Sequence, residues 1–336
     1  ESAQPRTAPQ SQHRTNTTHT RQQAIMAAKQ GPFDLMYYLK GALAGGICCS
    51  VTHGALCPVD VVKTRIQLDP VTYNRGLIGG FRQVIAADGA AALASGLGAT
   101  ASGYFVQGWF KFGGVEFFKI NIAKAIGERR AWENRTAIYL TAAACAEFIA
   151  DIFLCPLEAT RIRSVGDPKF PRGVVPGMMT IAKQDGIMGF YSGFGPILFK
   201  QIPYTMAKFA VQGKAAEVMY KATGKTHAEH GKAANLGISL GSGVVAGVAA
   251  AIISHPADTL LSKINKVGAG GTGGTVSRLV NISKEMGFVK LCLTGLPARC
   301  VMIGSLTAGQ FGIFDTVMRV LGAKKFRFTD PDKADS

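Results

Sequence analysis

The chain has 336 residues, of which 47% are hydrophobic and only 17% are charged, with 41 glycines and a formal net charge of +16. This composition favours a membrane protein over a soluble domain, because soluble domains carry more charge and less glycine. In a membrane, the positive excess predicts contacts with anionic lipid head groups and an anionic solute rather than with nucleic acid. The seven cysteines lie in apolar stretches and form no CxxC pair, which argues against a disulfide framework or a zinc site and predicts small, buried packing residues.

The N-terminal residues 1–32 form a polar segment with four basic side chains against one acid, Glu1. This composition is typical of a mitochondrial presequence or of a disordered tail, and the residues leave both interpretations open. The segment contains no apolar run of the kind that secretory signal peptides carry.

One eight-residue motif recurs at a long and nearly constant interval. It is PVDVVKTR from Pro58, PLEATRIR from Pro156 and, with changes, PADTLLSK from Pro256, so the prolines are 98 and 100 residues apart. Such a period indicates one structural unit that is used three times. We therefore expect three repeats, at 33–129, 130–223 and 224–322, followed by a polar C-terminal tail, 323–336, that is solvated from residue 324 onward.

Each repeat contains two apolar stretches near the ~20 residues that cross a bilayer as a helix. These stretches are 35–57, 93–110, 137–155, 190–207, 236–253 and 293–314. All of them contain Gly, Ser or Thr, which favours helices that pack against one another. GxxxG spacing predicts that Gly41, Gly45, Gly243 and Gly247 are helix-contact positions.

Short amphipathic segments lie between the two stretches of a repeat. Apolar residues at helical spacing in 77–85 and 178–182 predict short helices on a membrane surface. The sequences Asp88-Gly89 and Asp185-Gly186 are expected to end these helices, and the following glycines leave amides free for an anionic head group.

The repeated motif P-x-(D/E)-x-x-(K/R)-x-(K/R), with its later acidic-Gly turn, resembles the mitochondrial carrier family (solute carrier family 25) over residues 33–322. The segments Asp60–Leu68, Phe110–Gly114, Cys155–Arg163, Gln201–Tyr204 and His255–Asp258 resemble its phosphate-carrying members of fungal type. The resemblance implies an all-α membrane protein whose six transmembrane helices form three pseudo-threefold repeats around a central cavity, with short amphipathic helices on the matrix side. It also implies a multi-pass location in the mitochondrial inner membrane.

The proline motifs predict a gate at the matrix mouth of the cavity. A proline inside a membrane helix removes a backbone hydrogen bond and kinks the helix, so three equivalent kinks would draw three helix ends together. The charged residues that follow the prolines would then close a ring of ion pairs, made by Asp60, Lys63, Glu158, Arg161 and Asp258. Leu261 replaces the third base, so we expect two pairs and an acid, Asp258, without its partner. The alternative is static helix-end charges that face lipid head groups.

A second ring is expected from the family pattern at the opposite mouth, where the sequence supplies it only in part. Glu116 and Lys119 fit the pattern, whereas Gln212 replaces the acid of the second repeat and Met318 stands where a base belongs in the third. Arg319 is the predicted substitute base. We therefore expect a weak gate on this side.

Polar side chains recur at helical spacing on the second stretch of each repeat. They form single helix faces, and alignment of the repeats adds one arginine at a similar depth. A buried cation is costly unless it is paired, and no acids neighbour these bases on their own helices, which favours an anionic ligand over snorkelling lysines. Phosphate suits point charges from Lys and a planar fork from Arg. The predicted anion site comprises Thr100, Tyr104, Gln107, Lys111, Lys200, Tyr204, Lys208 and Arg299.

Titratable residues on the first stretch of each repeat predict a proton path. His53 lies seven residues before Asp60, and Asp151 has the same spacing to Glu158. Glu147 and Asp151, at i and i+4, repel one another if both are ionised, so one of them should hold a proton. The family resemblance implies phosphate import with one proton, and His53, Glu147, Asp151 and Glu158 match its proton-path positions. A lone membrane histidine is otherwise a packed, hydrogen-bonded residue.

Together these features predict a carrier that imports inorganic phosphate into the matrix with a proton, or in exchange for hydroxide, by alternating access. No nucleophile–base pair, metal-ligand cluster or cofactor motif occurs in the sequence, so neither an enzyme nor a cofactor is predicted. The expected partners are phosphate, protons and an anionic lipid such as cardiolipin, and a monomer is expected. Two alternatives stay open: a carrier of another small anion, such as a dicarboxylate, and a non-transporting membrane receptor with the same fold.

Overall fold

The computed structural model describes residues 33–69, 71–167, 169–171, 173–224, 229–264, 280–284, 287–293 and 296–328. All regular secondary structure in these ranges is helical. The presequence-like segment 1–32 and the last part of the predicted C-terminal tail, 329–336, lie outside the described residues.

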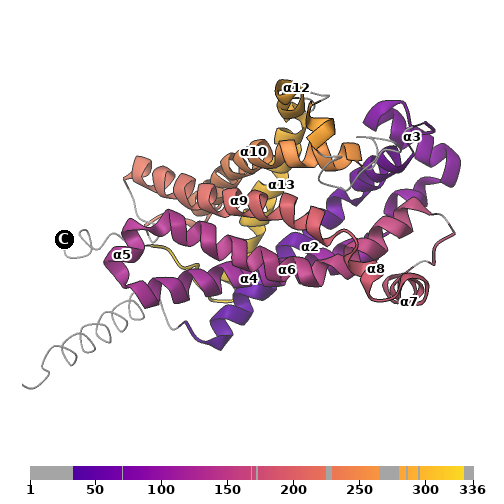
Figure 1. The fold of residues 1–336 in the computed structure, drawn as a ribbon. Helices are drawn as coiled ribbons and strands as arrows, with labels where there is room; N and C mark the ends of the chain where they lie inside the picture. The colour runs from indigo at the N-terminus through magenta and orange to yellow at the C-terminus, as the bar shows by residue number, and fades with distance from the viewer. Residues whose placement is uncertain are drawn as a thin grey trace, which may run out of the picture.

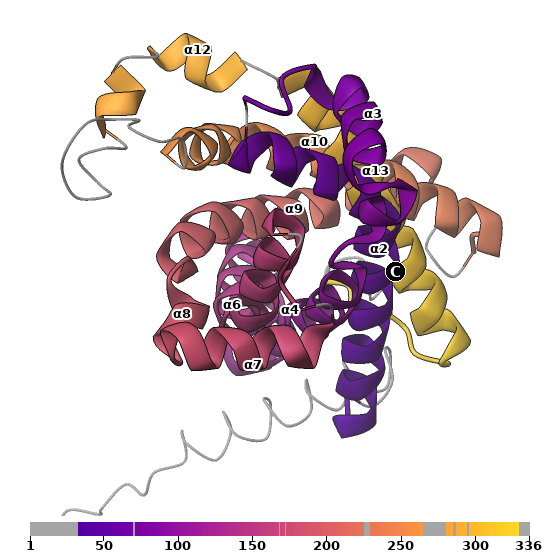
Figure 2. The same cartoon turned by 90° about the vertical axis from the view of Figure 1, so that its right-hand side faces the viewer.

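Six long helices form a closed ring in the described part of the chain. They are α2 (Leu35–Leu68), α4 (Leu97–Ile126), α6 (Arg135–Gly166), α9 (Phe194–Thr223), α10 (Lys232–Ile264) and α13 (Leu296–Val320). Each long helix packs against the next one in the chain, and α13 packs against α2, which closes the ring (Figure 2). The predicted all-α architecture of six helices in three pairs is therefore confirmed.

Short helices cover the two ends of this bundle. They are α3 (Gly76–Asp88), the 3-10 turn η1 (Ala90–Ala94), α5 (Glu128–Glu133), α7 (Val174–Asp185), α8 (Met188–Tyr191) and α12 (Phe288–Leu293). Figure 1 shows α3, α7 and α8 at one end of the bundle and α5 at the other. We call the first the signature end, because the proline motifs lead into it, and the second the Glu116 end.

Hydropathy alone finds fewer membrane-spanning helices than the fold contains. Among the described residues, four spans are long and apolar enough: Leu35–Ile66, Arg135–Val165, Lys232–Leu260 and Arg299–Val320. A fifth candidate joins Gly76–Asp88 to Ala90–Ile126 across a bend of 115°. Helix α9 is less apolar because Lys200, Gln201 and Lys208 lie within it. The repeat pattern is thus a better guide to the six helices than their apolar character.

The predicted prolines lie inside three of the long helices, Pro58 in α2, Pro156 in α6 and Pro256 in α10. Pro156 has no N–H to donate to the carbonyl of Ile152. The hydroxyl of Tyr191, in α8, donates to that carbonyl instead, at 3.3 Å. The backbone bond that the proline removes thus becomes an anchor for the short helix α8.

The two described surface helices α3 and α7 end at the predicted Asp-Gly turns. Asp88 and Asp185 are their last residues, and the glycines that follow have φ of 80° and 68°, a region that glycine adopts without strain. Arg65 Nη1 lies 2.7 Å from Asp88 Oδ2, and Arg163 pairs with Asp185 at the equivalent place in the second repeat. Each surface helix is therefore tied by its last acid to the preceding long helix.

Three of the four predicted glycine contacts occur. A Cβ added to Gly45 would lie 2.3 Å from the carbonyl oxygen of Gly108, so α2 and α4 touch backbone to backbone. Cβ atoms at Gly243 and Gly247 would meet the backbone of α13 at 2.7 and 2.5 Å. The prediction for Gly41 was wrong, since a Cβ there would meet nothing within 4 Å.

The seven cysteines are all free thiols, and most of them are packing residues as predicted. Cys48, Cys49, Cys57 and Cys155 are buried, and Cys292 and Cys300 are partly buried. The prediction was wrong for Cys145, which is exposed because it lies on a face of α6 that is not covered by other helices.

Four phenylalanines close the centre of the bundle toward the Glu116 end. Phe112 of α4, Phe209 of α9 and both Phe311 and Phe314 of α13 are 0–3% exposed. The ring of Phe112 lies 5.0, 5.7 and 4.9 Å from the rings of Phe209, Phe311 and Phe314. We call these four residues the aromatic plug. Three of its residues directly follow Lys111, Lys208 and Gln310 in the sequence, and Phe314 lies one turn further, so the plug lies on the Glu116 side of the predicted anion site.

Candidate functional site

The bases of the predicted anion site divide into two levels along the bundle. Lys111 and Lys208, next to the aromatic plug, are only 4% and 1% exposed, and we call them the inner level. Lys200 and Arg299 lie nearer the signature end, with side chains that are 36% and 12% exposed, and we call them the outer level. The prediction of a single cationic set at one depth is therefore replaced by two sets.

A buried carboxylate, Glu147 of α6, organises the inner level. Lys111 Nζ lies 3.0 Å from Glu147 Oε1, and Gln107 Nε2 donates to the same oxygen at 3.0 Å. Thr205 of α9 donates its hydroxyl to Glu147 Oε2 at 2.8 Å. Both oxygens of Glu147 are thus held by side chains from α4 and α9, and the predicted anion and proton residues form one network.

Asp151 extends this network by one helical turn. Gln107 Nε2 also donates to Asp151 Oδ1, at 3.3 Å, so a single amide bridges the two carboxylates. Asp151 is fully buried, and its Oδ2 has no hydrogen-bond partner among the described residues. The pair Glu147–Asp151 and the ammonium of Lys111 therefore share one water-poor site.

Lys208 has a different environment from Lys111. It donates to the amide oxygen of Gln310 in α13, and its Nζ lies 5.1 Å from the ring centroid of Phe112 and 5.6 Å from that of Phe311. No carboxylate of a described residue lies within ion-pair distance of it. Neutral amides and aromatic faces stabilise a cation only in part, so Lys208 carries the positive charge best placed for an anionic ligand.

The outer level contains an acid that the sequence predicted to be unpaired. Asp258 of α10 accepts a charge-assisted hydrogen bond from Arg299, and Lys200 Nζ lies 3.7 Å from its Oδ1. Arg299 also donates to Ser254 Oγ at 3.0 Å. Lys200 of α9 and Arg299 of α13 thus take the place of the base that is missing from the third motif, where Leu261 stands. The prediction that no acid neighbours these cations was correct within α9 and α13 but failed to include α10.

The remaining residues of the predicted matrix gate do not form a ring in this structure. Glu158 pairs with Arg161 of its own helix, at 2.7 Å. Asp60 and Lys63 make no ion pair with another described side chain. Among the described residues, no ion pair therefore joins the proline-bearing helices α2, α6 and α10 to one another at the signature end.

Four aromatic or hydroxyl residues of the prediction complete the site. His53 of α2 stacks on Tyr104 of α4, with ring centroids 3.5 Å apart and an interplanar angle of 1°. Tyr204 lies 3.5 Å from the hydroxyl of Thr307 in α13, and Thr100 is buried. The stacking places His53 against the predicted polar face of α4.

The Glu116 end is closed by contacts that the sequence predicted only in part. Glu116 and Lys119 form an ion pair and are 2% and 0% exposed. Gln212 accepts a hydrogen bond from Lys325 Nζ at 3.1 Å, whereas Arg319, the predicted substitute base, is exposed. The prediction for Arg319 was wrong because the chain turns back after α13 and brings Lys325 into the bundle instead.

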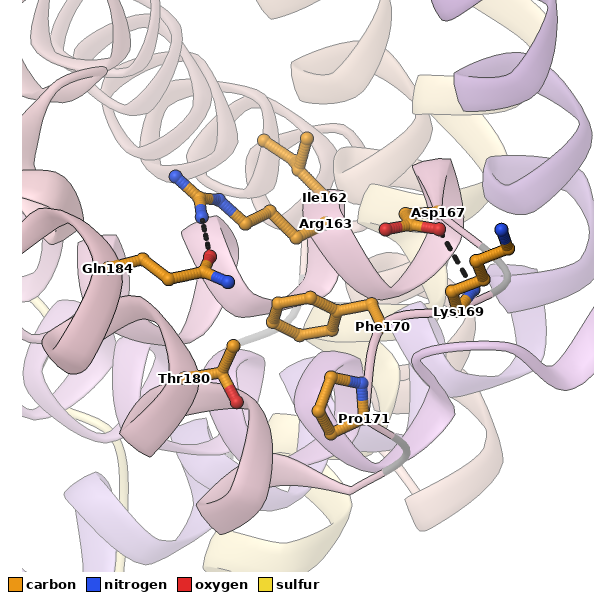
Figure 3. Close-up of a pocket in the computed structure, with 8 residues that line it drawn as sticks. All are labelled: Ile162, Arg163, Asp167, Lys169, Phe170, Pro171, Thr180 and Gln184. Carbon is orange, nitrogen blue, oxygen red and sulfur yellow. Dashed lines mark hydrogen bonds between the residues drawn. The ribbon is translucent and has the colours of Figure 1, made fainter.

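A separate cavity of about 460 Å³ lies at the signature end, between α6 and α7 (Figure 3). Arg163, Phe170, Thr180 and Gln184 are among its lining residues, and Arg163 donates to Gln184 Oε1 at 3.3 Å. None of the predicted anion or proton residues lines it. Among the described residues, no group of three or more His, Cys, Asp or Glu side chains is placed to hold a metal ion.

Comparisons with known proteins agree with the repeat structure. The family described as "Mitochondrial carrier protein" matches residues 35–125, 133–223 and 232–325. "Mitochondrial substrate carrier family protein N" of Dictyostelium discoideum is 49% identical over 288 residues, which is 85% of this chain and 95% of the relative. "Phosphate carrier protein, mitochondrial" of Caenorhabditis elegans is 45% identical over 285 residues, 84% of this chain and 80% of the relative. "Solute carrier family 25 member 3" of Homo sapiens is 40% identical over 282 residues, 84% of this chain and 75% of the relative. The chain belongs to the mitochondrial carrier family.

Proposed function

We propose that this carrier moves inorganic phosphate together with a proton across the mitochondrial inner membrane, into the matrix. Relatives at 45% and 38% identity bear the name of mitochondrial phosphate carriers, in Caenorhabditis elegans and Arabidopsis thaliana. The observation that carries the proposal is the inner level. There Lys208 forms no ion pair with a carboxylate of the described residues, and Lys111 is paired with Glu147. A small oxyanion fits two ammonium groups that are surrounded by neutral hydrogen-bonding side chains.

The charges of the inner level link anion binding to proton binding. Lys111 and Lys208 contribute two positive charges, and Glu147 with Asp151 contributes two negative charges when both are ionised. An arriving phosphate must then compete with Glu147 for Lys111. A proton on the Glu147–Asp151 pair removes that competition and leaves one net positive charge for the anion. Phosphate and proton therefore bind best together, which is the requirement of a symporter.

The outer level supplies the entrance. Lys200 and Arg299 share the single carboxylate of Asp258, so one positive charge is left over to attract an anion from the signature end. Glu158 lies between this end and the Glu147–Asp151 pair on α6, and His53 lies at the position of α2 that is equivalent to Asp151. We assign the proton relay to these two residues.

Alternating access follows from the two ends. The aromatic plug and the buried Glu116–Lys119 pair close one end, and the matrix-gate residues are not assembled at the other. In the alternate state, Asp60, Lys63, Glu158, Arg161 and Asp258 would close the signature end, which the family resemblance assigns to the matrix. The ring of six helices closes within one chain, so a monomer suffices for the pathway. Anionic lipids such as cardiolipin would bind at the first turns of the helices that follow the Asp-Gly turns, because the first N–H groups of a helix have no partner within it.

Transport by purified protein in liposomes tests this proposal. We expect phosphate uptake that an inward proton gradient accelerates, with no comparable uptake of a dicarboxylate. Lys208→Ala should slow phosphate uptake about 10- to 100-fold, since it removes a charge-assisted contact. Lys214→Ala, an exposed lysine on the same helix, is the matched control and should transport normally. Uptake of dicarboxylate instead of phosphate, or no uptake under any gradient, would overturn the proposal.

A further inference from the structure

The C-terminal residues Ala323–Phe328, which we call the C-terminal strap, enter the Glu116 end of the bundle. Helix α13 ends at Val320, and Gly322, with φ of 68°, reverses the chain. Ala323 N–H donates to the carbonyl of Met318 at 2.9 Å, which fixes the reversal. Figure 1 shows the strap in yellow, among the helix ends beside α5. Phe326 is only 3% exposed, so the prediction of a solvated tail from residue 324 was wrong here.

The backbone of the strap binds the acid and the base of the second ring. Phe326 N–H donates to Tyr37 Oη at 3.0 Å and to Glu116 Oε2 at 3.3 Å, and Tyr37 donates to Glu116 Oε2 at 2.8 Å. Lys119 Nζ donates to the carbonyl oxygen of Phe326 at 3.2 Å. A single peptide segment therefore satisfies charged groups that would otherwise be buried without enough partners.

Side chains of the strap reach further helices. Lys325 donates to Gln212 of α9 at 3.1 Å and lies over the ring of Phe311 in α13, 5.0 Å from its centroid. The ring of Phe328 lies 5.5 Å from that of Tyr139 in α6. With the bonds to α2 and α4, the strap contacts five of the six long helices.

We infer that the C-terminal strap is the lock of this mouth, in place of the ring of ion pairs that the sequence supplies only in part. Among the described residues, the ring positions of the even helices hold one pair, Glu116–Lys119, and both partners belong to α4, so this pair alone joins no two helices. The strap, by contrast, joins five of the long helices to one another. Helices that are bonded to one segment cannot separate while it stays in place, so the mouth opens only when the strap leaves. This inference rests on the alternating access proposed above.

Lysine acylation with site-resolved mass spectrometry tests the lock on the whole chain in lipid nanodiscs. Lys119, with a side chain that is 0% exposed, reports on the strap, and Lys214, at 54%, is the internal reference. A stop after Gly322 removes the strap, and a stop after Phe328 is the matched control that keeps it. We expect the shorter chain to label Lys119 about tenfold faster relative to Lys214, because it loses several buried hydrogen bonds, and the control to label like the full chain.

Phe326→Ala covers the case in which the shorter chain does not fold. It keeps the backbone bonds but loses the buried ring, so Lys119 labelling should rise by a smaller factor. Equal protection of Lys119 in the full chain, the shorter chain and Phe326→Ala would overturn the lock.

Inorganic phosphate provides the second arm. In liposomes that carry the full chain, where uptake can be measured, phosphate that drives turnover should accelerate labelling of Lys119, because the strap has to leave in each cycle. Active transport without any added labelling would make the strap a static cap and overturn the inference. A chain that takes up no phosphate overturns the proposed function instead, and the truncation comparison still decides whether the strap seals the mouth.

Discussion

At the scale of single residues, Glu147 is the group on which the proposed coupling depends. It is fully buried, and its two oxygens are bound by Lys111, Gln107 and Thr205. A buried carboxylate with these partners is stable as an anion only while Lys111 stays next to it. Whatever draws Lys111 away, such as a phosphate ion, also makes a proton on the carboxylate pair more favourable.

Glu147→Gln should separate phosphate movement from proton movement. Glutamine keeps the size and one acceptor oxygen but cannot take up a proton, and it leaves Lys111 available to phosphate. We expect phosphate/phosphate exchange within about tenfold of the unchanged protein, whereas acceleration by a proton gradient should disappear. Exchange and gradient-driven uptake in liposomes measure the two activities. Glu133→Gln, at an exposed site, is the control, and gradient-driven acceleration that persists in Glu147→Gln would contradict the prediction.

At the residue scale, the sequence could point to the charged and amide side chains of this network but not to one of its hydroxyl groups. Lys111, Gln107, Glu147 and Asp151 could be found because charged or amide side chains within an apolar helix demand a partner. Thr205 could not, because a threonine in a helix usually donates to a carbonyl of its own preceding turn. Thr52, Thr160 and Thr316 do so here, and only the position of α6 next to α9 gives Thr205 another partner.

At the scale of elements, the close approach of α2 and α4 positions two of the predicted site residues. Gly45 and Gly108 face each other so closely that neither helix has room for a Cβ. The close contact brings the backbones together along the helices that carry His53 and Tyr104, which stack 3.5 Å apart. The packing of two glycines thus sets the geometry of two predicted site residues.

Gly45→Ala and Gly41→Ala form a matched pair one turn apart on α2. The first should destabilise the protein by about 1–3 kcal/mol, since the added methyl meets the backbone of α4. The second meets nothing within 4 Å and should stabilise the helix by about 0.5–1 kcal/mol. Thermal unfolding in detergent measures both, and equal shifts for the two variants would count against the packing argument.

The elements themselves were largely predictable, with one exception. The period of the proline motif and the Asp-Gly turns specify the helices and the ends of α3 and α7, because both signals are local. The C-terminal strap was missed because its segment Lys-Lys-Phe-Arg-Phe looks solvated by composition. Its partners Tyr37, Glu116 and Lys119 are 289, 210 and 207 residues away in the chain, a distance over which no local pattern operates.

At the scale of the whole molecule, the exposed fraction of the interior lysine side chains falls from the signature end to the Glu116 end. Lys200 is 36% exposed, Lys111 is 5% exposed and Lys119 is 0% exposed in their side chains. The charged interior is therefore open to one side of the membrane. Sequence could predict a ring of charges at each mouth but not which mouth is closed, because both states use the same residues.

Asp258→Asn tests how the outer level feeds the inner one. Lys200 and Arg299 lose the carboxylate that they share, so phosphate should bind more tightly at the entrance and leave it more slowly. We expect a lower KM and a lower maximal uptake rate in liposomes. Asp185→Asn, which breaks the exposed pair with Arg163, should leave both quantities unchanged. An unchanged KM in Asp258→Asn would contradict this assignment of the outer level.

The closed ring of helices also has a consequence for how the chain is assembled in the bilayer. The partners of Glu147 come from α4 and α9, so this cluster is complete once the first two repeats have been inserted. Gln310, which accepts the hydrogen bond of Lys208, and α13, which packs against α2, are both added only when the last helix is inserted. Until then the nascent protein presents an unsatisfied ammonium at an open seam. We therefore expect a chain that stops before the final helix to leave this seam of the ring open.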